Sequence, residues 1–396
     1  MNKNIQHLYD IAAKKQRTII GLMSGTSLDG LDIALCRCNG AGTSTAVEIL
    51  RFETVAYHNI FRQEVKSIFS KRTVDLEKLC LLNEWIAVQH AGMINDCLVK
   101  WHIKKEEVDA IASHGQTIYH APKSLHQQTM FGNATLQIGD GDHLAVHTGI
   151  LTISDFRQKH IAAGGEGAPL ALYGDYLLFS KKNEERIMLN IGGIANFTYL
   201  PSNLDASKMF STDCGPGNTI MDAYTQQYSP PALYDEDASI AKRGTANQQL
   251  LTTLKLHGFF EQDFPKTTGP ELFNLTYLLE AQKRSDTVSL GHEDVMATLN
   301  QFTADIIVDA LQRTMQQKNF SVYASGGGMH NPLLMQNIKE QLPNASFRNI
   351  ADLNINPDAK EAILFAVLAN ETLCGGHTNF SGNIPNVSMG KISFPS

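Results

Sequence analysis

The sequence lacks the patterns that mark several large classes of protein. No stretch approaches the roughly 18 uninterrupted apolar residues needed to cross a bilayer. The first residues, MNKNIQHLYDIAAKKQ, lack the apolar core of a signal peptide. The six cysteines, at positions 36, 38, 80, 97, 214 and 374, include no Cys-x-x-Cys pair. These absences predict a soluble, cytoplasmic protein with reduced thiols and no membrane contact.

An excess of basic charge is also missing. The chain has 33 Lys and Arg against 40 Asp and Glu, a formal net charge of −7, and no basic stripe. This balance argues against nucleic acid as a partner. It is compatible with a phosphate-bearing ligand, because backbone N–H groups and a divalent cation can neutralise phosphates locally.

The common nucleotide and catalytic motifs are absent. There is no Gly-x4-Gly-Lys-Ser/Thr loop, and no Gly-x-Gly-x-x-Gly opens a helix after a strand. His143 and His147 have the i,i+4 spacing of a zinc-binding helix but lack the Glu of His-Glu-x-x-His, so we interpret them as surface or cleft residues. Ser24 lacks the Gly-x-Ser-x-Gly elbow of a hydrolase. Any nucleotide must be bound by other elements.

Strands and helices alternate along the chain, which predicts an α/β fold. Residues 17–57 read as three strands that begin with a hairpin, and residues 186–201 read as a second hairpin that restarts the same plan. The 396 residues exceed what one core usually serves. We expect two lobes with a ligand in the cleft between them. The predicted parts are an N-terminal helical extension (1–16), an N-terminal lobe (17–185) and a C-terminal lobe (186–396), with the option that helix 358–373 packs back on the first lobe.

Three glycine turns follow predicted strands. The first, Gly25–Asp32, combines glycines that permit close backbone approach with hydroxyls and N–H donors that suit phosphate oxygens. Asp29 and Asp32 would repel bare phosphate, so they make sense chiefly with Mg²⁺ between them and a nucleotide. The alternative is a polar hairpin turn with side-chain-to-backbone hydrogen bonds.

The other two turns are Gly192-Gly193, inside the second hairpin, and Gly326-Gly327-Gly328, between an apolar strand and a helix. The triple glycine places N–H groups where a nucleotide could rest. An ordinary loop without a ligand is the alternative for each turn alone. Three such turns at strand ends in one chain favour a ligand.

Two acids are candidates for catalysis. Asp213 follows a short strand in STDCGPGN, where it could accept a proton from an attacking hydroxyl or water. Its alternative role is to cap the next helix. Glu361 begins an otherwise apolar helix, where its alternative role is a favourable interaction with the helix dipole.

Long motifs occur in one order along nearly all of residues 18–388. They are GLMSGTSLDGLD, SHGQT (113–117), TLQIGD (135–140), DFR (155–157), AAGGEGAPL (162–170), LNIGGIAN (189–196), DCGPGN (213–218), FPKTTGPELFN (264–274), SGGGMHNPLLM (325–335) and EAILFAVLA (361–369). With these motifs the chain resembles the anhydro-N-acetylmuramic acid kinase family of the actin/hexokinase/heat-shock-ATPase superfamily. The resemblance implies a two-lobed actin-like ATPase fold, a duplicated ribonuclease H-like unit with an inter-lobe cleft.

The resemblance also implies an activity. Such a kinase uses ATP and water to open the bridge of 1,6-anhydro-N-acetylmuramic acid and phosphorylates O6, giving N-acetylmuramic acid 6-phosphate and ADP in bacterial cell-wall recycling. Asp213 falls on the base that activates water, and Glu361 on an acid that helps to hold it. ATP, Mg²⁺ and a homodimer are implied too. The residues assigned to nucleotide binding are Gly25, Thr26, Ser27, Leu28, Asp29, Gly30, Leu31, Asp32, Gly192, Gly193, Gly326, Gly327 and Gly328, with Asp29 and Asp32 as metal ligands.

The chain departs from the family pattern at four places. His160 stands where the family usually has Asp, Glu166 where it has Gln, Ala171–Asp175 in place of Val-Pro-Ala-Phe-His, and Ser388–Gly390 in place of Thr-Gly-Ala. These changes spare the nucleotide motifs. They leave open a kinase for a related sugar, and a nucleotide-binding sensor without turnover is the alternative from another class.

Overall fold

The computed structural model describes residues 2–168, 170–353, 357–375 and 385–395. Contacts divide the chain into two compact units, Met1–Phe179 with Ile355–Ser396, and Ser180–Asn354. The first boundary thus follows residue 179, whereas the sequence was divided after residue 185. The C-terminal segment is grouped with the first unit. The sequence analysis counted it in the second lobe, with the option that helix 358–373 packs back on the first.

The first unit is built on one mixed sheet with the order β12-β6-β4-β1-β2-β3, in which β5 also pairs with β4. Strands β1, β2 and β3 are antiparallel, and β4 and β6 run parallel to β1. The elements of this unit are β1 (Gln16–Ser24), β2 (Gly30–Asn39), β3 (Ala46–Ala56), β4 (Ala110–Ala121), β5 (Ala134–Ile138), β6 (Thr152–Ser154), β12 (Lys391–Ser393), α1 (Lys3–Ala13), α2 (Asn59–Lys66), α3 (Leu76–Trp101), α4 (Lys123–His126), α5 (Gly141–Thr148), α6 (Phe156–Ala162), α7 (Ala171–Phe179) and α13 (Lys360–Cys374).

The second unit repeats this plan. Its sheet has the order β11-β10-β7-β8-β9, again with three antiparallel strands followed by two that run parallel to the first. The repeated strand order and direction confirm the α/β class and the duplicated ribonuclease H-like unit. The elements are β7 (Arg186–Ile191), β8 (Ile194–Leu200), β9 (Phe210–Pro216), β10 (Phe320–Ser325), β11 (Ala345–Asn349), α8 (Thr219–Tyr228), α9 (Gln248–Lys255), α10 (Leu275–Arg284), α11 (His292–Met315) and α12 (Pro332–Gln341).

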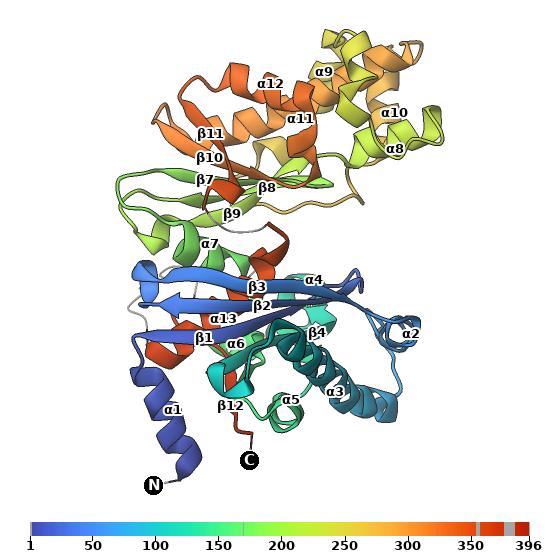
Figure 1. Ribbon diagram of the computed structural model, residues 1–396. Helices are drawn as coiled ribbons and strands as arrows, with labels where there is room; N and C mark the ends of the chain where they lie inside the picture. Colours follow the sequence, from blue (N-terminus) through green and yellow to red (C-terminus); the bar gives the residue numbers. More distant parts are fainter. Residues whose placement is uncertain (1, 169, 354–356, 376–384, 396) are drawn as a thin grey trace. The chain divides into compact units, whose positions relative to one another are not determined.

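Strand β1 shows why the first sheet is covered on both faces. Ile20 and Leu22 belong to the apolar cluster that includes the buried side of α3. Gly21, between them, points to the opposite face, because a Cβ there would lie 1.9 Å from the carbonyl oxygen of Ala362 in α13. Successive strand residues face opposite sides, so α3 and α13 cover opposite faces of the sheet (Figure 1). The missing side chain of Gly21 lets the α13 backbone approach the strand closely.

The second unit has its own apolar core, formed largely by the buried face of α11 against β7 and β8. Among the described residues, no helix is both long and apolar enough to pass through a membrane.

Candidate active site

The turn between β1 and β2 presents polar groups to solvent. Thr26, Ser27 and Asp29 are exposed, whereas Leu28 is 1% exposed and has a positive φ of 60°. The buried Leu28 side chain anchors the turn, and the carbonyl of Asp29 accepts a hydrogen bond from the Tyr57 N–H at 3.1 Å. An alanine Cβ at Gly25 would meet only the Ser27 hydroxyl, at 3.5 Å. The turn therefore exposes the Thr26 and Ser27 hydroxyls and leaves open space beside Gly25 for a ligand.

A buried chain of hydrogen bonds supports this turn from below. The Tyr57 hydroxyl lies 2.9 Å from Nε2 of His90 and donates to the Ser24 hydroxyl at 2.7 Å, and Ser24 donates to Oε1 of Gln116. Because the Tyr57 hydroxyl donates to Ser24, Nε2 of His90 donates to Tyr57. Burial lowers the pKa of His90 to about 3, which keeps the ring neutral at neutral pH. Ser24 is 2% exposed and its hydroxyl is held in this chain, so it supports the turn and is not exposed to a ligand.

Two carboxylates of the first unit act on each other. Asp32, on β2, accepts a hydrogen bond from the Thr54 hydroxyl at 2.6 Å, and burial raises its pKa despite that bond. Glu361 lies in the first turn of α13. Burial raises the pKa of Glu361, and the negative charge of Asp32 raises it further. Arg157 and Lys360 act in the opposite direction. Asp32, Glu361 and Arg157 therefore form one electrostatic neighbourhood.

Arg157 itself is held by a buried histidine. Its Nε donates to Nε2 of His114 at 3.0 Å, which leaves Nδ1 of His114 to donate to the carbonyl of Gly115 at 2.9 Å. Burial first, and the Arg157 charge second, lower the pKa of His114 to about 3. The sequence analysis quoted SHGQT and DFR as motifs but assigned no role to either residue. The two residues lie 43 positions apart, and no local pattern shows that they pair.

In the second unit, the glycine turns at 192–193 and 326–328 lie side by side at the strand ends. The N–H of Asn218 donates to the carbonyl of Gly192 at 2.8 Å. A Cβ on Gly326 would lie 2.6 Å from the carbonyl oxygen of Ile191, and one on Gly328 would meet the Ile191 side chain at 2.3 Å and Asn218 Oδ1 at 3.1 Å. The two glycine turns and the start of α8 therefore form one cluster. Position 326 requires glycine, because its φ is 84°.

A cavity of about 410 Å³ opens beside this cluster. Gly327, Gly328 and Asn218 line it together with several acids. One of them, Asp222 in the first turn of α8, has its pKa raised to about 6 by burial. The sequence analysis did not identify Asp222.

Asp213, on β9, is oriented by a distant loop. Its Oδ2 accepts the backbone N–H of Thr268 at 2.8 Å, and its own N–H donates to the carbonyl of Lys266 at 2.9 Å. The helix after it, α8, has Asn218 at its N-cap without a side-chain cap. Asp213 is therefore not a helix cap, the alternative role that its sequence context allowed. Burial raises its pKa, and the Thr268 amide lowers it in part.

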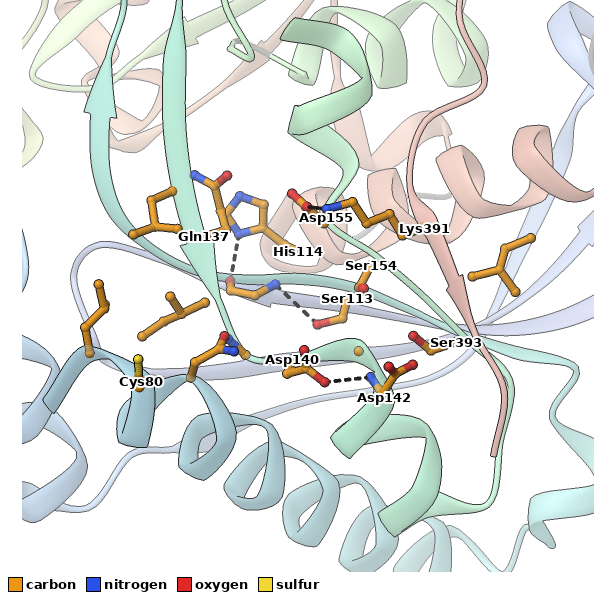
Figure 2. Close-up of a pocket in the computed structure, with 18 residues that line it drawn as sticks. Cys80, Ser113, His114, Gln137, Asp140, Asp142, Ser154, Asp155, Lys391 and Ser393 are labelled. Carbon is orange, nitrogen blue, oxygen red and sulfur yellow. Dashed lines mark hydrogen bonds and ion pairs between the residues drawn. The ribbon is translucent and has the colours of Figure 1, made fainter. Parts of the chain in front are cut away.

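A second cavity, of about 540 Å³, lies in the first unit where α3, β4, β5 and the start of α5 meet β6 and β12 (Figure 2). Asp140 caps α5 by accepting the N–H groups of Asp142 and His143, and Lys391 pairs with Asp155 on the rim. None of the residues predicted for catalysis or nucleotide binding lines this cavity. Among the described residues, no group of three or more His, Cys, Asp or Glu is arranged to hold a metal ion.

Comparison with known proteins gives one family. Residues 17–393 match the family model described as Anhydro-N-acetylmuramic acid kinase. Curated proteins of that name are 59% identical in Pseudoalteromonas atlantica, over 100% of both chains, and 37% identical in Caldanaerobacter subterraneus, over 98% of this chain and 100% of the relative. Among solved structures, the activator of a 2-hydroxyisocaproyl-CoA dehydratase from Clostridium difficile with bound ADPNP shares 13% identity, over 90% of this chain and 95% of that one, with a TM-score of 0.38.

Proposed function

The chain belongs to the anhydro-N-acetylmuramic acid kinase family, and from this premise we propose its reaction and the residues that carry it out. The protein is an ATP-dependent kinase that acts on a small sugar. It opens the bridge of 1,6-anhydro-N-acetylmuramic acid with water and phosphorylates O6, giving N-acetylmuramic acid 6-phosphate and ADP. This reaction returns an amino sugar of the cell wall to metabolism.

The reaction needs one base. Water attacks C1 of the sugar and gives a proton to the base, and the C1–O6 bond breaks as its electron pair moves to O6. O6 then forms a bond to the γ-phosphorus of ATP, and ADP leaves with the electrons of the broken P–O bond. Positioning and charge stabilisation supply most of the rate enhancement in such a transfer.

The raised pKa and fixed position of Asp213 carry the assignment of this base. One carboxylate oxygen is held by the Thr268 amide, while no hydrogen bond to Oδ1 is found among the described residues. A carboxylate with one anchored and one free oxygen is oriented and can still accept a proton. Its raised pKa makes it a better proton acceptor than an exposed aspartate.

The first unit contributes an acid and a cation. Glu361 holds the attacking water through its carboxylate, and Arg157, fixed by His114, faces the same neighbourhood. Arg157 is a donor suited to the carboxylate or hydroxyl groups of the sugar, because its guanidinium is oriented before substrate binds.

Each unit also contributes to nucleotide binding. We assign phosphate contacts to Gly25–Asp32 in the first unit and to Gly192, Gly193 and Gly326–Gly328 in the second, where the 410 Å³ cavity accommodates the nucleoside. Asp29 and Asp32 fit the oxygen-donor chemistry of Mg²⁺, which usually takes one or two carboxylates along with phosphates and water. When bound, Mg²⁺ supplies charge neutralisation at the phosphates.

A kinase for a related sugar is the second candidate, since His160, Glu166 and residues 171–175 depart from the family pattern. The hydrogen bond of His160 weakens this candidate. Its Nδ1 accepts the backbone N–H of Gly167, so this nitrogen serves the protein's own structure rather than a sugar. A nucleotide-binding sensor without turnover is the third candidate. The retention of Asp213 and Glu361 in the sequence weighs against it.

An assay with purified protein, Mg-ATP and the anhydro sugar separates these candidates. We expect one ADP for each ring-opened phosphosugar, measured by coupled ADP release and product mass. N-acetylmuramic acid without the bridge serves as the control substrate. Turnover with another sugar only would favour the second candidate, and ATP binding without sugar-dependent turnover would favour the sensor.

The base is tested by Asp213→Asn. The amide keeps the bond to the Thr268 N–H but is a very weak proton acceptor, so we expect kcat to fall by about three orders of magnitude. ATP affinity, measured by calorimetry, should change less than threefold. Retained turnover would remove Asp213 from this role.

We further propose a homodimer in the cytoplasm. The support is family membership for the dimer, and for the compartment six cysteines that all carry free thiols. Sedimentation equilibrium should give about twice the chain mass of 43.6 kDa. The chain mass alone would contradict the dimer.

A further inference from the structure

Lys266 is a buried cation that forms no salt bridge within the described part of the chain. It is 7% exposed, and its ammonium donates to the carbonyls of Phe259, at 2.8 Å, and Phe260, at 3.3 Å. The ammonium also lies 4.3, 5.8 and 5.4 Å from the ring centres of Phe259, Phe260 and Phe264. Burying an ammonium without a carboxylate is costly. Carbonyl and cation–π contacts offset part of that cost only with this geometry.

The backbone of Lys266 forms hydrogen bonds with the strand that carries Asp213. The Lys266 N–H donates to the Thr212 hydroxyl at 3.0 Å, and the Lys266 carbonyl accepts the Asp213 N–H at 2.9 Å. Two residues later, the Thr268 N–H donates to Oδ2 of Asp213 at 2.8 Å. The loop 266–268 therefore holds both the backbone and the carboxylate of residue 213. The position of this loop is fixed in turn by the hydrogen bonds from the Lys266 ammonium to the carbonyls of Phe259 and Phe260.

We propose that Lys266 is a positioning residue for the catalytic base, holding the Thr268 amide against the carboxylate of Asp213 so that the other oxygen faces the attacking water. The inference rests on the proposed role of Asp213. Lys266 does not touch substrate in this scheme. It acts through the loop, and its loss therefore changes the orientation and basicity of Asp213 rather than the binding of either substrate.

The direction of the change follows from the Thr268 hydrogen bond. That amide stabilises the ionised carboxylate and lowers the pKa of Asp213. Weakening the bond raises the pKa, so the acid limb of the pH–rate profile moves to higher pH. The neighbouring ionisable groups are Cys214, which burial keeps neutral, Lys266 and, beyond it, Arg313.

The main test is Lys266→Met, which keeps an unbranched apolar stem and removes the donors and the charge. We expect kcat to fall about 10- to 100-fold, KM for ATP and sugar to stay within threefold, and the acid limb to move up by about one pH unit. Lys266→Arg, which retains donors for the carbonyls, should restore the wild-type limb. An unmoved limb in Lys266→Met would overturn the proposal.

Arg313→Met is the matched control. Arg313 donates to the same Phe260 carbonyl, at 2.9 Å, and its guanidinium lies 4.6 Å from the ring centre of Phe264. No hydrogen bond from Arg313 to residues 266–268 is found in the described structure. Its removal should disturb the turn at 259–264 without moving the acid limb. An equal shift in Arg313→Met would show that any damage to this turn has the same effect, which contradicts a specific role for Lys266.

A double-mutant cycle separates this proposal from the assignment of Asp213. If Lys266 acts through Asp213, Lys266→Met should lower the residual rate of Asp213→Asn by less than twofold. An equal loss in both backgrounds overturns the positioning role. If Asp213→Asn alone keeps full turnover, the assignment of the base fails instead.

Thr268→Pro deletes the amide hydrogen directly and gives a second measurement should Lys266→Met fold poorly, as judged by circular dichroism. It should move the acid limb in the same direction. Lys266→Gln, with a shorter donor, should give an intermediate shift. If the acid limb of the pH–rate profile stays at its wild-type pH in both Thr268→Pro and Lys266→Gln, the proposal is overturned.

Discussion

Nδ1 of His160 accepts a hydrogen bond from the backbone N–H of Gly167 at 2.9 Å. This bond ties α6 to the loop that leads to α7, and the ring also packs edge-on against Tyr173, with 5.6 Å between ring centres. Only a neutral imidazole can accept at Nδ1, and burial together with the Arg157 charge lowers the pKa of His160. A carboxylate at residue 160 could accept the same N–H, so the departure from Asp at this position keeps the acceptor.

Substitution at residue 160 tests whether the acceptor is what matters. His160→Asp should keep stability and sugar KM close to wild type, whereas His160→Phe leaves the Gly167 N–H without a partner. An unsatisfied buried donor costs about 1–3 kcal/mol. Urea unfolding and initial-rate kinetics measure both effects. A large change in sugar KM for His160→Asp, with stability unchanged, would show instead that His160 selects the substrate.

A buried ion pair links the altered segment 171–175 to α13, the helix that carries Glu361. The Lys360 ammonium lies 2.7 Å from Oδ1 of Asp175, whose side chain is 4% exposed. Lys360 directly precedes Glu361, and its charge lowers the pKa of that carboxyl. We therefore expect Lys360→Met to raise the pKa of Glu361 and to weaken the fold by about 3 kcal/mol, because Asp175 loses a charged partner.

The double variant provides the control for this pair. Asp175→Asn combined with Lys360→Met removes both charges, so it should be less destabilised than Lys360→Met alone. Denaturant unfolding measures the stability, and the pH dependence of kcat reports the shift of Glu361. Additive losses in stability would mean that the pair contributes no coupling energy.

The elements that sequence predicted best are those specified locally. The hairpins at 17–39 and 186–200 are apolar runs joined by Gly-containing turns, and each strand appears within a few residues of its predicted place. The short edge strands β11 and β12 were missed. A three-residue strand such as β12 exists because β6 offers it a partner, and nothing in its own sequence requires it.

The candidate site was predictable in part for the same reason. Asp213 and Glu361 stand out because an acid at a strand end or at the start of an apolar helix is locally unusual. Their partners are not local. Thr268 reaches Asp213 across 55 positions, and α13 approaches β1 only because Gly21 lacks a side chain. Such contacts depend on the folded chain, and a single sequence does not show which distant residues meet.

Alanine substitution tests whether the glycine turns serve a ligand or the fold. A Cβ on Gly25 or Gly327 would meet no atom closer than 3.5 Å, so the free protein tolerates alanine at both positions. A phosphate lying against the backbone would not. We expect Gly25→Ala and Gly327→Ala to keep the melting temperature within about 2 °C and to weaken ATP binding at least tenfold by calorimetry.

Gly92→Ala is the control for those variants. Gly92 lies in α3 with no atom within 4 Å of an added Cβ, and alanine there should stabilise the helix by up to about 1 kcal/mol without affecting ATP. Unchanged ATP affinity in both turn variants would remove these glycines from the nucleotide site.

Acid should unfold the protein through two buried histidines. Burial lowers the pKa of His90 and of His114 to about 3, from about 6.5 for an exposed histidine. Between these values the unfolded chain binds more protons than the native one. The stability from keeping each ring neutral is therefore complete above pH 6.5 and is lost as the pH falls toward 3. For each histidine, the free energy of unfolding should fall by about 1.4 kcal/mol as the pH is lowered from 7.5 to 5.5.

His90→Gln isolates the contribution of one ring. The glutamine amide can donate to the Tyr57 hydroxyl as Nε2 of His90 does, but it does not titrate. Urea unfolding at pH 7.5 and 5.5 should show about half of the acid-induced loss that these two rings cause in the wild type. Because the same hydroxyl holds Ser24 below the Gly25–Asp32 turn, ATP affinity at pH 5.5 should also fall less in this variant. Equal losses in both proteins would mean that His90 takes up its proton without breaking the chain that supports the turn.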